Sequence, residues 1–186
     1  MKPNKALAVL LPLALLFVAF QPSAKGSEWD QKMTVTLEAP VEVPGVGQIK
    51  VIDPGTYVFK LMDRSTARNI IQIWNADETQ LITTILALPD YREQPPDAPI
   101  VKFGENAAGA PVAVREVFYP GDNYGWEFVY TRARAIKIAK ANRRNVLSKT
   151  DTSVEPHTLA NAEVNAVTPQ GNNAENSTAA NPKPQN

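Results

Sequence analysis

Three strand-like segments follow one another in the middle of the chain, and their short connections restrict the fold more than any other feature. β-Branched and aromatic residues are frequent in Thr56–Met62, Asn69–Trp74 and Gln80–Leu88, as is typical of strands. The connections, residues 63–68 and 75–79, are too short for the crossover helix that parallel neighbours require. We therefore expect an antiparallel meander, with Gln80–Leu88 in a central position because both of its faces are largely apolar or threonine.

Further strand-like segments lie on both sides of this meander, and proline and glycine separate them. Proline cannot donate to a sheet ladder, and glycine accepts the positive φ of tight turns. Asp53-Pro54-Gly55 is a strong turn signal on these grounds, and the four prolines between Pro89 and Pro99 predict a loop. The additional strands that we expect are Met33–Glu38, Val41–Val43, Ile100–Phe103, Val112–Tyr119 and Trp126–Tyr130.

The composition changes at Thr131–Val146, where alanine, lysine, arginine and isoleucine replace the β-branched alternation. No proline or glycine interrupts this segment, so it predicts a helix of about four turns. The expected fold class is therefore mainly β, an antiparallel β-sandwich or open barrel with one C-terminal α-helix.

The segment Met1–Gly26 has the layout of a secretory signal peptide. Lys2 and Lys5 precede the apolar run Ala6–Phe20, and small and polar residues follow. The run is shorter than the roughly 20 residues that span a bilayer, although an uncleaved anchor helix is an alternative. We expect cleavage after Gly26, with Ala24 as the alternative, and a mature chain without a transmembrane segment that is periplasmic or extracellular.

The last part of the chain, residues 149–186, has a different composition. It holds no aromatic residue, and its few apolar residues are scattered among asparagine, alanine, threonine, proline and serine. Such a segment buries too little apolar surface to offset the entropy of ordering it. We therefore expect a disordered tail after one globular domain of residues 27–148.

Charge and composition exclude several classes of function. Cleavage would remove Lys2, Lys5 and Lys25, which lowers the basic count from 19 to 16 against 19 acids and predicts no general affinity for nucleic acid. Without cysteine the chain has no disulfides and no thiolate metal sites. The single histidine, His157, lies in the expected tail, and no glycine-rich phosphate loop is present, so we expect no metal or other cofactor.

The densest cluster of aromatic residues lies in Phe118–Tyr130, which holds six of the twelve aromatic residues that follow the leader. Aromatic rings beside Asp and Asn can stack on a sugar and bond its hydroxyls, which predicts a ligand site. The alternative is a core hairpin whose turn uses Asp and Asn for local backbone bonds, and calcium binding is a further alternative with too few oxygen ligands. The candidate ligand-binding residues are Tyr119, Asp122, Asn123, Tyr124 and Trp126.

Basic residues crowd the expected helix, and no acid lies between Thr131 and Lys149. Such a helix can touch an anionic surface, or it can be an ordinary solvated face. The basic residues are Arg132, Arg134, Lys137, Lys140, Arg143 and Arg144.

Two glutamates on the expected hairpin offer a remote catalytic interpretation. Glu116 and Glu127 lie on the strands that flank the turn and would approach each other like the carboxylate pair of a glycosidase. The alternative is an outer-face charge cluster, with Arg115 available to pair with them.

Two stretches carry a resemblance to a known group of proteins: Asp53-Pro54-Gly55-Thr56-Tyr57-Val58-Phe59-Lys60-Leu61 and Phe118-Tyr119-Pro120-Gly121-Asp122-Asn123-Tyr124-Gly125. They resemble small secreted β-domain proteins of acidobacteria and related soil bacteria, over roughly Trp29–Asn142. The resemblance implies an exported bacterial β domain but no chemistry and no site residues, and the basic helix departs from the more mixed helix of that group.

These features together favour an exported, non-enzymatic module of the bacterial envelope that binds a glycan or a partner protein. A structural or accessory envelope protein that acts through protein–protein contacts is the alternative. A hydrolase acting on glycans is a remote one.

Overall fold

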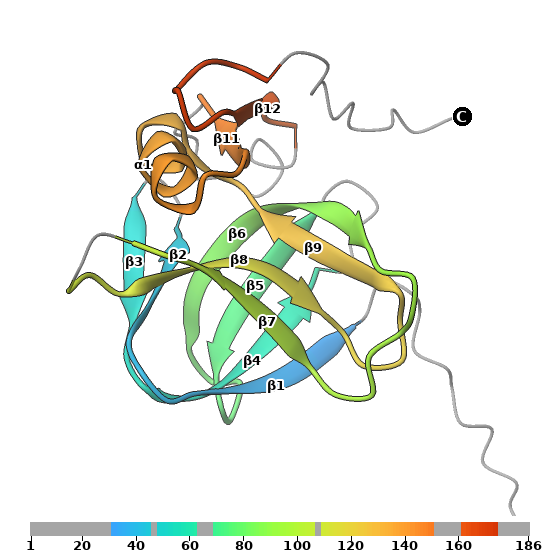
Figure 1. Cartoon of the computed structure of the whole chain (residues 1–186). Helices are drawn as coiled ribbons and strands as arrows, with labels where there is room; N and C mark the ends of the chain where they lie inside the picture. Colours follow the sequence, from blue (N-terminus) through green and yellow to red (C-terminus); the bar gives the residue numbers. More distant parts are fainter. Residues whose placement is uncertain (1–30, 46–47, 63–68, 107–108, 151–160, 175–186) are drawn as a thin grey trace, which may run out of the picture.

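A computed structural model describes residues 31–45, 48–62, 69–106, 109–150 and 161–174 of the chain (Figure 1). Within these residues the protein is mainly β, with a large mixed sheet, a small second sheet and one helix, which confirms the expected fold class. The predicted leader and its cleavage site lie outside the described residues. The elements are β1 (Lys32–Leu37), β2 (Val41–Pro44), β3 (Ile49–Ile52), β4 (Gly55–Leu61), β5 (Ile70–Asn75), β6 (Leu81–Tyr91), β7 (Ile100–Gly104), β8 (Val112–Phe118), β9 (Tyr124–Phe128), β10 (Tyr130–Thr131), α1 (Arg132–Asn142), β11 (Val146–Lys149) and β12 (Val164–Val167).

The large sheet contains the predicted meander at its centre. Strands β4, β5 and β6 pair antiparallel in chain order, as the short connections require. The order along the sheet is β1-β4-β5-β6-β9-β8-β2-β3, and β7 pairs with β8 beside this path. The long strand β6 lies between β5 and β9, so its predicted central position is confirmed.

This sheet curls around a single interior without closing into a barrel (Figure 1). In β1 every second residue is buried, and Met33, Val35 and Leu37 join the main core cluster. The large side chains of the aromatic hairpin alternate in the same way. Trp126 and Phe128 belong to this cluster together with Tyr130, whereas Val129 packs in a smaller cluster on the other side.

Strand β6 is longer than the sequence predicts, because it continues through Pro89 to Tyr91 instead of ending before a proline loop. Val129 donates its backbone N–H to Leu86 O at 2.9 Å, and the register alternates from there along β6 and β9. The backbone of Pro89 therefore points away from β9. Because no bond to β9 is made at this position, the N–H that proline lacks costs no hydrogen bond. The predicted loop of residues 89–99 is wrong for its first three residues.

The helix α1 is shorter than the predicted segment Thr131–Val146. It ends at Asn142, because Arg143 adopts the left-handed conformation with φ 52° although it is not a glycine. The chain then turns back, and Val146 is buried in β11 instead of extending the helix. Strand β11 runs parallel to β10, so α1 is the connection between two parallel strands.

The prediction of a disordered tail is wrong for residues 161–174. Strand β12 pairs antiparallel with β11, and Val164 and Val167 are buried. The apolar residues of this segment are too few to form a core of their own. Val167 instead joins the main core cluster together with Ile138 of α1 and Val146 of β11. The globular part therefore extends beyond residue 148, at least to Ala174.

The described part of the chain contains no helix with the length and hydropathy that a membrane span requires.

Removal of β12 should destabilise the whole protein. A chain that ends at Thr150 loses the burial of Val164 and Val167, and we expect a decrease of about 3 kcal/mol in the free energy of unfolding. Urea denaturation followed by tryptophan fluorescence measures this difference. A chain that ends at Ala174 is the matched control and should unfold like the full chain. Equal midpoints for both truncations would contradict a structural role of β12.

Candidate functional site

The five residues predicted to bind a ligand do not lie together on one surface. Tyr119 and Trp126 are only 2% and 4% exposed, and both belong to the main core cluster. Tyr124 is 39% exposed, and Asp122 and Asn123 are partly exposed at the turn. For Tyr119 and Trp126 the prediction of a surface site is corrected, because a strand that faces the interior needs such large apolar side chains. The core-hairpin alternative describes both of them.

The structure adds a partner for Tyr124 that the sequence did not indicate. Tyr91, at the end of β6, lies directly opposite Tyr124 of β9, and their ring centroids are 4.6 Å apart with planes inclined at 54°. Tyr91 is 62% exposed, which makes it the most exposed large apolar side chain among the described residues. Its position followed from no sequence signal, because the prolines of residues 89–99 predicted a loop. We call these two side chains the tyrosine pair.

The tyrosine pair lies where the interior face of the sheet reaches solvent. Tyr124 is on the same face of β9 as Trp126, and Tyr91 is two residues beyond Pro89, which lies opposite Trp126. Among the described residues, no group accepts a hydrogen bond from Trp126 Nε1 or from the hydroxyl of Tyr119. Burial also raises the pKa of Tyr119 above that of an ordinary tyrosine, so this hydroxyl keeps its proton. Two neutral donors therefore lie in the core near the pair.

Several contacts hold the turn beside the tyrosine pair in place. Gly121 adopts a positive φ of 81°, and its N–H bonds Pro96 O at 2.8 Å. The N–H of Arg92 donates to Asn123 O at 2.9 Å, and a carboxylate oxygen of Asp122 accepts from the side chain of Gln31, just before β1. The turn is thus tied to three separate positions, so the backbone that carries Tyr124 is well fixed.

The two glutamates proposed as a glycosidase pair lie directly opposite each other on β8 and β9. Each carboxylate is bound to a cation, Glu116 by Lys102 and Glu127 by Arg115 at 2.7 Å. Arg115 also donates to Asn145 O at 3.1 Å. Burial raises the pKa of Glu127 above that of an ordinary glutamate, although the Arg115 guanidinium opposes this shift. The arrangement matches the alternative of an ion-paired cluster that contains Arg115.

Phe118 lies on the outer face of the sheet, yet it is fully buried. The guanidinium of Arg92 and the ammonium of Lys102 lie 5.2 Å and 4.7 Å from its ring centroid, which is within the range of cation–π attraction. Gly125 makes this packing possible, since a Cβ there would lie 2.3 Å from the Phe118 ring. Two cations of this face are therefore held by an aromatic ring.

The basic helix divides into internal and exposed cations. Arg134 makes two 2.6 Å hydrogen bonds to the Glu42 carboxylate of β2, and Arg132 donates to Gly171 O at 3.2 Å. These two residues hold the helix to other parts of the fold. Their cations are therefore less available to an anionic surface than the sequence predicts. The basic residues that are exposed are Lys137, Lys140, Arg143 and Arg144.

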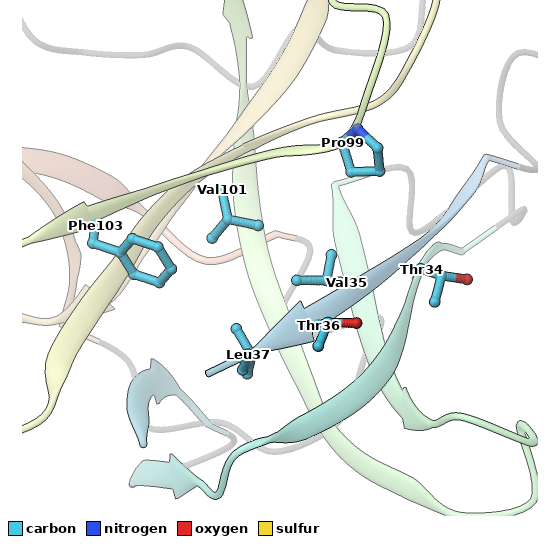
Figure 2. A pocket seen from close by; sticks show the side chains of 7 residues that line it. All are labelled: Thr34, Val35, Thr36, Leu37, Pro99, Val101 and Phe103. Carbon is cyan, nitrogen blue, oxygen red and sulfur yellow. The ribbon is translucent and has the colours of Figure 1, made fainter. Parts of the chain in front are cut away.

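A groove of about 300 Å³ lies between β1 and β7, two strands that do not pair with each other (Figure 2). The described residues of its walls carry no charged side chain, and Phe103 at its rim is 47% exposed. We call this groove the seam, because it separates the two parts of the curled sheet. The residues that line it are Thr34, Val35, Thr36, Leu37, Pro99, Val101 and Phe103. Sequence patterns did not predict it, since it depends on how the sheet curls.

Metal binding has no geometric support in the part of the chain that the structure describes. No three histidine, aspartate or glutamate side chains there lie close enough to hold one ion together. The calcium alternative rests on Asp122 and Asn123, and the Asp122 carboxylate accepts a hydrogen bond from Gln31.

Trp126 and Tyr124 should respond differently to truncation. Trp126→Ala opens a cavity in the core and should decrease the free energy of unfolding by about 4 kcal/mol. Tyr124→Ala removes a partly exposed side chain at the rim, so the decrease should stay below about 1 kcal/mol. Thermal and urea unfolding of the two variants measure the contrast. Similar losses in both would contradict the placement of Trp126 in the core and Tyr124 at its rim.

Carbon-13 NMR titration of Glu127 should give a pKa above that of an ordinary glutamate. Since the folded pKa then exceeds the unfolded one, Glu127 makes the protein less stable as pH rises through the interval between them. Arg115→Met removes the opposing charge and should raise the pKa further, whereas Lys102→Met, beside Glu116, is the matched control. A Glu127 midpoint at or below the ordinary value would disprove the effect of burial.

Comparison with known proteins gives no assignment. No protein-family model matches the chain, and neither a curated protein nor a solved structure matches it. A function must therefore be derived from the residues and geometry of the chain itself.

Proposed function

We propose that the chain is a non-enzymatic binding module that recognises a glycan through the tyrosine pair. The single observation that carries this proposal is the exposure of Tyr91 and Tyr124 side by side, with ring centroids 4.6 Å apart. Both side chains leave a large fraction of their surface open to solvent, 62% for Tyr91 and 39% for Tyr124. Their presence at this position favours contact with a ligand.

Tyrosine rings suit a sugar for electrostatic and entropic reasons. The C–H groups of a pyranose carry small positive charges and are attracted to the negative face of an aromatic ring. The 54° inclination gives the pair a tilted surface, against which one sugar residue can touch both rings. Tyrosine offers this contact area with only two side-chain torsions, so little conformational entropy is lost on binding.

Polar groups next to the tyrosine pair can bond the hydroxyls of a sugar. Asn123 precedes Tyr124 in the turn and is partly exposed, and an amide side chain both donates and accepts. Asp122 is the neighbouring residue, with one carboxylate oxygen engaged by Gln31 and the other available as an acceptor. The tied turn fixes these groups before a ligand arrives, which lowers the cost of binding.

Binding is better supported than catalysis. Glu116 and Glu127 each hold a cation, and Glu127 is on the face of β9 opposite to Tyr124 and Trp126. A sugar on the tyrosine pair would therefore not contact the Glu127 carboxylate. A hydrolase remains the weaker candidate for this reason.

The proposal includes a location outside the cytoplasm, in the periplasm or beyond the cell. It is supported by the order of charged, apolar and small residues in Met1–Gly26. Expression of the full chain in a bacterium, followed by fractionation and N-terminal sequencing, tests both the location and the cleavage after Gly26.

Loss of the tyrosine pair should weaken glycan binding without unfolding the protein. A glycan array identifies a ligand, and calorimetry then compares the original protein with the double variant Tyr91→Ala, Tyr124→Ala. We expect at least a tenfold weaker affinity, since the loss of stacking on two rings removes about 1.4 kcal/mol or more. Leu81→Ala, an exposed apolar residue at the other end of β6, is the matched control and should bind normally. A glycan that binds the double variant as tightly as the original protein would refute the proposal.

A further inference from the structure

The seam is bordered on one side by the free edge of β1. Within the described part of the chain this strand pairs with β4 alone, and Leu61 donates its N–H to Gln31 O at 2.9 Å at the start of the ladder. In an antiparallel pair every second residue bonds to the neighbour, and the residues between them direct N–H and C=O to the other side. The register of β1 and β4 therefore turns the backbone of Thr34 and Thr36 toward the seam.

The opposite side of the seam is the free edge of β7. Beginning at the bond from Val129 N–H to Leu86 O, the alternation can be followed through the registers of β9 and β8 to β7. By this alternation the backbone of Lys102 bonds to β8. The backbone N–H and C=O of Val101 therefore point away from β8, into the seam. Backbone donors and acceptors thus face the groove from both sides.

The side chains of the seam are apolar where the backbone is polar. Val35 and Leu37 are buried at the β1 wall, and Val101 and Phe103 project from β7 (Figure 2). A ligand that fits both properties must offer main-chain hydrogen bonds along its length and an uncharged side chain at every second position. An extended polypeptide has both, because its side chains alternate between two faces.

We propose that the seam binds an extended segment of another protein, which adds to β1 as a new strand with an apolar, uncharged residue at every second position. This second surface is separate from the tyrosine pair and gives the domain a protein partner. Its chemistry is main-chain pairing with Thr34 and Thr36 and apolar contact with Val35, Leu37 and Phe103.

Two other occupants fit the seam less well. An edge strand of a second copy brings its own paired neighbour about 4.8 Å away, so two strands would have to fit beside a groove whose volume is about 300 Å³. The end of this chain, from Glu175 to Asn186, contains Pro182 and Pro184 and no apolar side chain larger than alanine apart from these prolines, so it lacks the pattern that the seam requires. An extended segment of a different protein has no paired neighbour of its own, so it can lie beside β1 as a single strand.

The test is a selection from a displayed library of seven-residue peptides, with Val, Ile, Leu or Phe at alternate positions and Thr, Ser or Lys between them. Thr34→Pro removes the N–H that faces the seam, whereas Thr34→Val keeps it. Position 34 of an edge strand tolerates proline because its N–H makes no bond to β4. Circular dichroism and thermal unfolding verify that both variants remain folded.

We expect peptides that bind the original protein and Thr34→Val with similar affinity and bind Thr34→Pro at least tenfold more weakly. Hydrogen exchange at the amides of Thr34 and Thr36 should slow at least tenfold in the complex, because these N–H groups become hydrogen-bonded. Phe103→Asp, at the exposed rim, should weaken the same peptides at least tenfold and leave glycan binding at the tyrosine pair unchanged.

Two results would overturn the proposal. One is a selection in which no peptide is enriched more strongly on the original protein than on Thr34→Pro. The other is a bound peptide that leaves the exchange of Thr34 and Thr36 unchanged, since binding would then use side chains alone. If an alkyl probe enters the seam equally well in Thr34→Pro and Thr34→Val while no peptide is selected, the groove is a small apolar ligand site instead.

Discussion

The buried hydroxyl of Tyr130 is the contact on which the arrangement of the two sheets depends. It donates to Val114 O of β8 at 2.8 Å and lies 3.3 Å from Glu42 O of β2, while the ring is fully buried. Burial is the main cause that raises the pKa of Tyr130, so the hydroxyl stays protonated and remains a hydrogen-bond donor. The helix begins shortly after it, and Arg134 bonds the carboxylate of the same Glu42. Tyr130 and Arg134 therefore both tie the helix and the second sheet to Glu42 of the first sheet.

Local patterns predicted most of the fold because the strands are amphipathic or apolar with short connections. The alternation of Trp126, Phe128 and Tyr130 in one cluster followed directly from their spacing. The failures have physical causes. Residue spacing does not tell on which side of β6 the missing N–H of Pro89 lies, and a non-glycine residue such as Arg143 gives no signal that it will end a helix.

The candidate site was predicted only in part, because exposure depends on register between distant strands. Tyr124 could be named from the aromatic turn, but its partner Tyr91 enters through the pairing of β6 with β9, two strands that are far apart in the sequence. The same turn gave Tyr119 and Trp126, whose apolar bulk serves the core as well as it would serve a ligand. The seam follows from the curl of a whole sheet, which local spacing does not encode.

The bond between Glu42 and Arg134 joins residues 92 positions apart, and the parallel pairing of β2 with β8 spans a similar part of the chain. Contacts of such high sequence separation form late, because much of the chain must be ordered before they close. During synthesis from the N-terminus, the β4–β6 meander can assemble early, whereas the core cluster that contains both Val43 and Tyr130 is complete only after Tyr130 has emerged. Until then part of the apolar interior stays exposed, and exposed apolar surface of this kind makes a partly folded chain prone to aggregation.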